Sequence, residues 1–217
     1  MEKKEIFKRY MLFIVSLFFA ALGVAFAKSG ELGVSPISSV PNVLSLKFTS
    51  VSMGNWLIIW NCLLITGQII ILRKNFKLIQ LLQIPLSFLF GYFTDFGMRC
   101  VSFIPVNSYF IRLAMVIAGV IILGFGISLS VIANVIMNAG EAFVKVVSDT
   151  LNKNFANVKI VFDIGNVTLS IILSLILFDF SIQGTREGTL IAAFCTGLAV
   201  KFFTKKLSEP LNKLLSK

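Results

Sequence analysis

Long stretches of apolar residues, with little alternation between apolar and polar positions, dominate the chain. A helix needs about 20 mostly apolar residues to cross a bilayer core of about 30 Å, because each residue rises about 1.5 Å. Six stretches fit this requirement: 10–27, 48–72, 78–94, 113–134, 160–178 and 188–203. The second is expected to become helical near Gly54, and the last, which contains Lys201, is the weakest. The pattern predicts an all-α polytopic membrane protein that forms one membrane domain over residues 1–217.

Composition agrees with lipid, rather than water, as the main solvent of the protein surface. Hydrophobic residues make up 57% of the 217 residues, charged residues 14%, and the mean hydropathy is +0.91. Soluble domains carry about 25% charged residues. Too few polar side chains are present to cover a soluble globule, so a soluble enzyme is not expected.

The net charge of +10 is explained by membrane orientation. In a soluble protein this charge would indicate nucleic-acid binding, but here the basic residues gather at the ends of the apolar stretches. With both termini in the cytoplasm, only Lys28, Lys47, Arg99, Arg112 and Arg186 fall on the outer side. The positive-inside rule therefore predicts cytoplasmic termini, with the lipid bilayer and not nucleic acid as the partner.

Catalytic and metal-binding patterns are missing from the sequence. The chain contains no histidine. Its three cysteines, Cys62, Cys100 and Cys195, are odd in number and far apart, and Cys62 and Cys195 lie inside apolar stretches, so neither a metal cluster nor a disulfide framework is expected. It has no phosphate-binding glycine loop and no set of nucleophile and base. We therefore predict no enzyme activity, no cofactor and no metal site.

A weak internal repeat with a spacing of about 100 residues divides the chain into halves at about 10–96 and 111–204, followed by a cytoplasmic tail at 205–217. The repeat pairs LGVA at 22–25 with LGFG at 123–126, WLIIWN at 56–61 with VKIVFD at 158–163, and GYFTD at 91–95 with GLAVK at 197–201. Each half holds three predicted spans. An odd number turns the second half upside down, so the sequence predicts a 3+3 inverted repeat of the kind found in secondary transporters.

The connection after the first span of each half has two interpretations. Segments 33–46 and 138–151 are small, polar and then amphipathic. Ser35-Pro36 and Asn138-Ala139-Gly140 would suit helix starts, because serine and asparagine side chains can cap a helix and proline fits its first turn. They could be re-entrant half-helices whose positive ends meet at a central solute. They could equally be surface loops with short interfacial helices.

The candidate binding residues are polar groups in or beside apolar stretches: Ser35, Pro36, Asn61, Gln83, Gly140, Glu141 and Asp163. Asp163 is the sharpest candidate because a carboxylate within a span is costly unless it is paired or hydrated. It can serve a solute or proton, or it can pair with Lys159 four residues earlier. Asn61 and Gln83, like Gln68, can contact a ligand or form interhelical hydrogen bonds.

Other charged and small residues have plainer interpretations. Asp95 with Arg99, and Arg186 with Glu187, are expected to form surface ion pairs at the outer ends of spans. The small residues of the first span, Ala21 and Ala25 among them, suit close helix packing, either within the chain or against a partner.

The sequence also resembles the YczE/YyaS/YitT family of bacterial membrane proteins. The resemblance rests on LGVSP at 32–36, GYFTD at 91–95, GE at 140–141, KIVFD at 159–163 and REGT at 186–189. It implies a multi-pass protein of the bacterial plasma membrane with a repeated design, and it implies no particular substrate.

Three functions remain open at this point. The first is a permease or exporter of an unknown small solute. The second is a substrate-binding membrane subunit of an ATPase-driven importer, docked through the alanines of the first span. The third is a non-transporting accessory membrane protein. A homo-oligomer is compatible with each of them.

Overall fold

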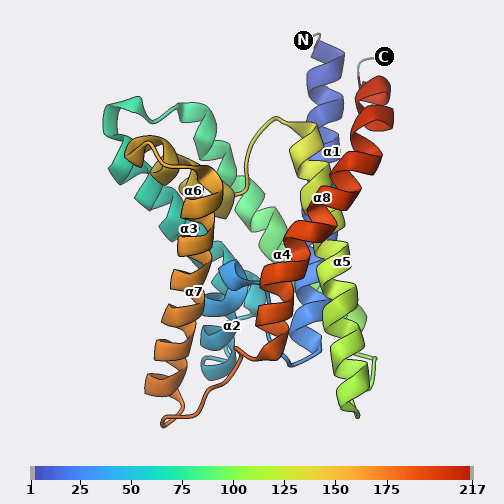
Figure 1. Ribbon diagram of the computed structural model, residues 1–217, viewed down its shortest axis with the longest axis vertical. Helices are drawn as coiled ribbons and strands as arrows, with labels where there is room; N and C mark the ends of the chain where they lie inside the picture. The colour runs from blue at the N-terminus through green and yellow to red at the C-terminus, as the bar shows by residue number, and fades with distance from the viewer. Residues whose placement is uncertain (1–2, 216–217) are drawn as a thin grey trace.

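The computed structural model describes residues 3–215, which are helical along most of their length (Figure 1). The helices are α1 (Lys3–Ser29), α2 (Pro36–Lys47), α3 (Met53–Leu72), α4 (Gln83–Val101), α5 (Tyr109–Ala133), α6 (Ala139–Leu151), α7 (Phe155–Leu177) and α8 (Glu187–Leu215). Two 3-10 helices, η1 (Arg73–Asn75) and η2 (Leu78–Leu82), join α3 to α4. No strand occurs in this described part, and the predicted all-α class is confirmed.

Four helices are long and apolar enough to cross a membrane: those at Lys4–Ser29, Met53–Asn75, Tyr109–Ala133 and Phe155–Leu177. They correspond to α1, α3, α5 and α7, so the prediction of a helical membrane protein agrees with the structure. The predicted spans at 78–94 and 188–203 fall on α4 and α8, which do not meet the same criterion. Asp95 and Arg99 lower the hydropathy of α4, and Lys201 with the basic residues after it lowers that of α8.

Two boundaries differ from the sequence prediction. The stretch at 78–94 begins with the 3-10 turn of η2, and its α-helix starts only at Gln83. Pro85 lies in the first turn of α4, where its missing N–H costs no intrahelical hydrogen bond, so the helix starts just before it. The last helix extends beyond the predicted limit at 203 and continues to Leu215, so most of the expected tail is helical.

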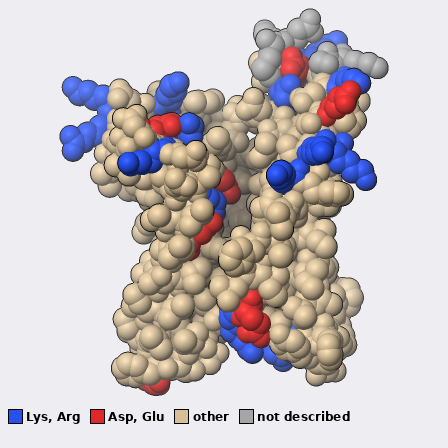
Figure 2. Space-filling model, in the orientation of Figure 1, with Lys and Arg blue, Asp and Glu red and all other residues tan. Residues whose placement is uncertain are grey.

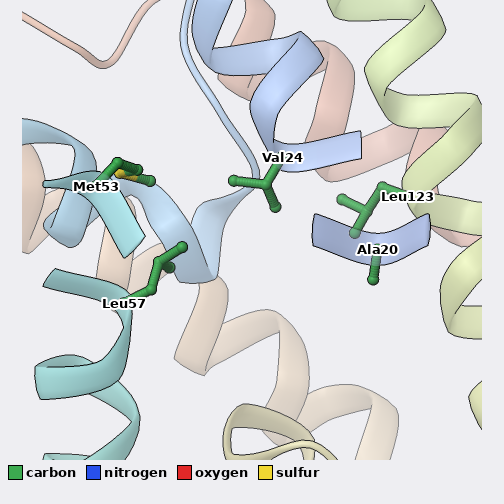
Figure 3. Close-up of a cluster of buried hydrophobic side chains, with 5 residues drawn as sticks. All are labelled: Ala20, Val24, Met53, Leu57 and Leu123. Atoms are coloured by element: carbon green, nitrogen blue, oxygen red, sulfur yellow. The ribbon is translucent and has the colours of Figure 1, made fainter. Parts of the chain in front are cut away.

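The most extensive contact between two helices is that of α1 with α5, where small residues bring the two backbones together. A Cβ added to Gly23 would lie 2.4 Å from the backbone N of Leu123, and one added to Gly126 would lie 2.4 Å from the backbone N of Ala20. Small residues permit this approach, which gives dispersion contacts in place of the hydrophobic effect that lipid does not supply. Ala20 and Leu123 belong to a buried cluster that also includes Val24, Met53 and Leu57 of α1 and α3 (Figure 3).

The outer helices pack on this central pair, α4 on α1 and α8 on α5. Ala21 and Ala25 are fully buried, and the Cβ of Ala25 lies 2.9 Å from where a Cβ on Gly97 of α4 would stand. The small residues of α1 are therefore used for packing within the chain. They leave no exposed alanine face for docking a partner.

The order long, short, long, long occurs twice along the chain. Pro36 and Ala139 begin the short helices, and Met53 and Phe155 begin the helices that follow them. The short helices cross to the other half: α2 packs on α7, and α6 packs on α3. One contact differs between the halves, because α3 packs along α4 whereas α7 and α8 barely touch.

Enlarging a residue at the contact between α1 and α5 should destabilise the protein. Gly126→Val is expected to lower the free energy of unfolding by about 1–3 kcal/mol, because the new side chain must push α1 away from α5. Titration with SDS in mixed micelles, followed by circular dichroism, measures this change. Gly165→Val on α7 is the matched control, since a Cβ there meets nothing within 4 Å. Equal losses of unfolding free energy in both variants would contradict the assignment of the α1–α5 contact as the main packing contact of the molecule.

Candidate functional site

The two short helices point their N-termini at each other. In Figure 1, α2 lies in the lower part of the molecule and α6 near the upper end, where α1 begins and α8 ends. A Cβ on Gly140 would lie 3.0 Å from Cδ1 of Ile37, so the first turns of α6 and α2 are in contact. The positive ends of two helix dipoles therefore meet inside the molecule.

Ser35 and Asn138 occupy the N-cap positions, but neither side chain caps its helix. The Ser35 hydroxyl donates to Oγ of Ser38 at 3.0 Å. The prediction that Ser35 and Pro36 start a helix is confirmed, with Pro36 in its first turn. The prediction of side-chain capping is wrong, because the Ser35 hydroxyl bonds to another hydroxyl instead.

The segment before α2 lies against the start of α8. The Gly188 N–H donates to the Leu32 carbonyl oxygen at 2.8 Å. Gly33 has a φ of +113°, a conformation that favours glycine, and a Cβ there would lie 2.3 Å from Oγ1 of Thr189. These contacts fix where the chain turns from α1 into α2.

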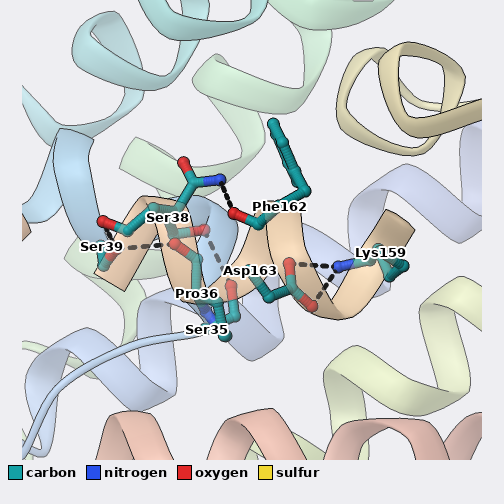
Figure 4. A network of polar contacts seen from close by, with 8 residues as sticks. Ser35, Pro36, Ser38, Ser39, Lys159, Phe162 and Asp163 are labelled. Carbon is teal, nitrogen blue, oxygen red and sulfur yellow. Dashed lines mark hydrogen bonds and ion pairs between the residues drawn. The ribbon is translucent and has the colours of Figure 1, made fainter. Parts of the chain in front are cut away.

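On α7, the Lys159 ammonium forms an ion pair with the Asp163 carboxylate (Figure 4). Their spacing of four residues places both side chains on one face of the helix. The two side chains keep exposed fractions of 26% and 24%, so neither is sealed from its surroundings. The pairing that the sequence allowed is therefore formed, and it leaves the carboxylate accessible.

Glu141 lies in the first turn of α6, close enough to Lys159 and Asp163 to respond to their charges. Among the described residues, no basic group comes within ion-pair distance of this carboxylate. Glu141, Lys159 and Asp163, together with the starts of α2 and α6, form what we call the central site.

The face of the molecule seen in Figure 2 is hollowed between two parts, one built by α3, α6 and α7 and the other by α1, α5 and α8. Acidic and basic side chains gather part-way down this hollow. A separate pocket of about 170 Å³ lies between α6 and α7 and is lined by apolar residues: Phe143, Val144, Val147, Val158, Val161 and Phe162. The charged groups therefore lie along the open hollow and not in that pocket.

A polar stripe joins α7 to α2. The only buried residues of α7 are Asn166, Ser170 and Ser174, spaced four apart on one face. The Ser39 hydroxyl of α2 donates to the Pro36 carbonyl at 2.6 Å and to the Asn166 carbonyl at 3.3 Å, as Figure 4 shows in part. Sequence analysis missed this stripe, although the spacing of four in an apolar helix is a signal that could have revealed it.

Gln83 has a supporting position. Its side-chain amide exchanges two hydrogen bonds with that of Gln68, at 3.0 and 3.2 Å, and Gln68 also donates to the Ala139 carbonyl at 3.3 Å. The pair thus ties α3 and α4 to the start of α6, which confirms the interpretation as an interhelical bond. Asn61 on α3 forms no side-chain hydrogen bond with any described residue, so no contact ties it to the central site.

The two predicted surface ion pairs have different outcomes. Arg186 and Glu187 pair at 3.4 Å, as expected. Asp95 does not pair with Arg99: its carboxylate accepts from the Gly54 N–H at 2.8 Å and from the Ser52 hydroxyl at 2.5 Å. The Gly54 N–H at the start of α3 has no acceptor within its own helix, so the Asp95 carboxylate binds it and does not pair with Arg99.

A family model matches residues 7–205, and its description is a family of unknown function, DUF6198. The chain belongs to this family. The DUF6198 match includes both short helices and every residue of the central site. Searches among curated proteins and solved structures find no match. The resemblance to the YczE/YyaS/YitT family stays a prediction.

The Gln68–Gln83 pair can be tested by a double-mutant cycle. Gln83→Leu should lower the free energy of unfolding by about 1–3 kcal/mol, because it leaves the Gln68 amide buried without its partner. The double variant with Gln68→Leu should regain part of that loss. SDS titration of the purified protein measures all four corners of the cycle. Strictly additive losses would show that the two amides do not interact.

Proposed function

We propose that this protein carries a small solute across the bacterial plasma membrane and that the central site is where the solute binds. In this proposal α1, α3 and α4 form one set of three spans, and α5, α7 and α8 form the second set in inverted orientation. The re-entrant helices are α2 and α6. Both termini lie in the cytoplasm.

The meeting of the two helix starts is the observation that carries the proposal. Irregular backbone at membrane depth is tolerated only where it is buried in protein or lines a cavity. In inverted-repeat transporters such segments bind the solute between the repeats, near the midplane. The contact of Gly140 with Ile37 corresponds to this arrangement, with one short helix contributed by each half.

Charge supports a binding role for the same place. Two carboxylates and one ammonium gather beside two positive helix ends, whereas the charged residues of the other candidate spans lie near the ends of those helices. Ionisable groups within a membrane domain are costly and mark solute or proton pathways. In the proposed mechanism, a polar solute replaces part of the Lys159–Asp163 contact, and Glu141 supplies a second contact.

Assigning α4 and α8 as spans requires that their polar residues be sheltered. With 19 and 29 residues they are long enough to cross the bilayer core. Asp95 is held by the start of α3, and the first turn of α8 lies against Leu32. Packing thus shelters Asp95 of α4, whereas Arg99 and Lys201 stay exposed.

The alternative as a subunit of an ATPase-driven importer loses one of its arguments. The alanine pair of α1 was a possible docking face, and both Ala21 and Ala25 are buried within the chain. We therefore favour a protein that transports by itself.

The inverted arrangement predicts opposite sidedness for two loops. In a variant without native cysteines, Ser50→Cys, between α2 and α3, should react with a membrane-impermeant maleimide in intact cells. Lys153→Cys, between α6 and α7, should react only after the cells are made permeable. Labelling followed by gel shift measures both. Reaction of both cysteines from the same side would contradict the inverted repeat.

Solute binding should depend on Asp163. A thermal-shift screen of the purified protein against metabolites identifies a ligand, because a molecule that binds the native state raises its apparent stability. Asp163→Asn is expected to weaken binding of that ligand at least about tenfold, the size of effect seen when one charge-assisted contact is lost.

Asp149→Asn is the matched control for this experiment. Asp149 pairs with Lys145 at the same spacing of four residues, but with exposed fractions of 60% and 49%, and it lies near the end of α6. The Asp149→Asn variant should bind the ligand as tightly as the unmodified protein does. Unchanged binding and transport in Asp163→Asn would refute the role given to Asp163.

A further inference from the structure

The first half of the molecule is closed by a contact between α3 and α4. The two helices touch through glycines: a Cβ on Gly91 would lie 2.6 Å from the carbonyl oxygen of Gly54. Asp95 of α4 then binds the start of α3 through Ser52 and the Gly54 N–H. Backbone contact and hydrogen bonds together hold these two helices against each other.

The second half is open at the corresponding place. The repeat spacings pair Gly54 with Ala156 and Gly91 with Gly197. Both partners are small, as a close contact would require, yet both are exposed, and a Cβ on Gly197 would meet nothing within 4 Å. The helices that carry them, α7 and α8, barely touch, and Figure 2 shows the hollow that separates them.

We infer that α7 and α8 form a gate, which closes through Ala156 and Gly197 in the way that α3 and α4 are already closed through Gly54 and Gly91. The gate at α3 and α4 opens when the gate at α7 and α8 shuts. The structure is then the state in which the central site communicates with the end where α1 begins and α8 ends. This inference rests on the proposed inverted-repeat transporter.

The two gates differ in how they are held shut. Asp95 accepts hydrogen bonds from the start of α3, but its repeat equivalent on α8 is Lys201, which can only donate. At the start of α7, the Ala156 N–H, which is the repeat equivalent of the Gly54 N–H, donates instead to Oδ1 of Asn154 at 2.8 Å. The α7–α8 gate therefore lacks the hydrogen bonds that hold the α3–α4 gate, which explains why it is the open one of the two.

Paired spin labels test the coupling of the two gates. In a cysteine-free background, one pair is Asn55→Cys with Arg99→Cys across α3 and α4. The other pair is Asn157→Cys with Lys205→Cys, at equivalent positions across α7 and α8. All four side chains are exposed. Distances are measured by double electron–electron resonance in lipid nanodiscs.

Asp95→Ala removes the hydrogen bonds of the closed gate and supplies the perturbation. The long-distance population of the Asn55–Arg99 pair should rise at least about tenfold, as expected for the loss of hydrogen bonds to a charged group. The short-distance population of the Asn157–Lys205 pair should rise with it. Opening of the first pair with no shortening of the second would overturn the inference, and so would distances that never change.

Gly197→Leu gives a second test that leaves the present state intact. It should fold normally and block the Asn157–Lys205 pair from shortening in the Asp95→Ala background. Gly165→Leu is the matched control, because a side chain at Gly165 also enters open space. The repeat equivalent of Gly165 is Leu63, which is exposed and lies outside the α3–α4 contact, so Gly165 is not expected to take part in closing the gate. Shortening that persists in Gly197→Leu would overturn the role of Gly197. These readouts concern distances alone, so their failure would leave solute binding at the central site to be judged by the Asp163 variants.

Discussion

The close approach of α1 and α5 is the interaction on which the other helices depend. Lipid tails are as apolar as leucine, so apolar side chains alone give two membrane helices little reason to associate. Glycine and alanine let the two backbones approach until one helix lies in the groove of the other, around Gly23 and Gly126. Once this pair is fixed, α4 and α8 each have a surface to pack on.

The polar groups of the molecule divide into two kinds by their partners. Gln68, Gln83 and Asp95 bond across helices and hold the ends of other helices in place. Lys159 and Asp163 bond to each other on one helix and remain partly exposed. The first kind positions the frame, and the second is left available for a solute. Composition does not separate the two, because both consist of polar residues in apolar stretches.

Sequence analysis predicted the helical class and the starts of both short helices, because Pro36 and the small polar residues around Gly140 are strong local signals. It also allowed the Lys159–Asp163 pair, which depends only on a spacing of four. It could not predict that Asp95 binds the start of α3, since that choice depends on which helix end comes near. For the same reason it placed Gln83 among the ligand candidates, whereas the structure gives that residue the Gln68 amide as its partner.

The crossing of the short helices has a consequence for how the protein is made. The polar face of α2, with Ser39 and its neighbours, packs on α7, which leaves the ribosome more than a hundred residues later. During that interval α2 has no protein surface to satisfy its hydroxyl groups, so it must wait at the lipid headgroups or in the insertion machinery. Neither half is complete alone. Synthesis of the chain therefore has to reach α7 before the first half can take its final place in the bilayer.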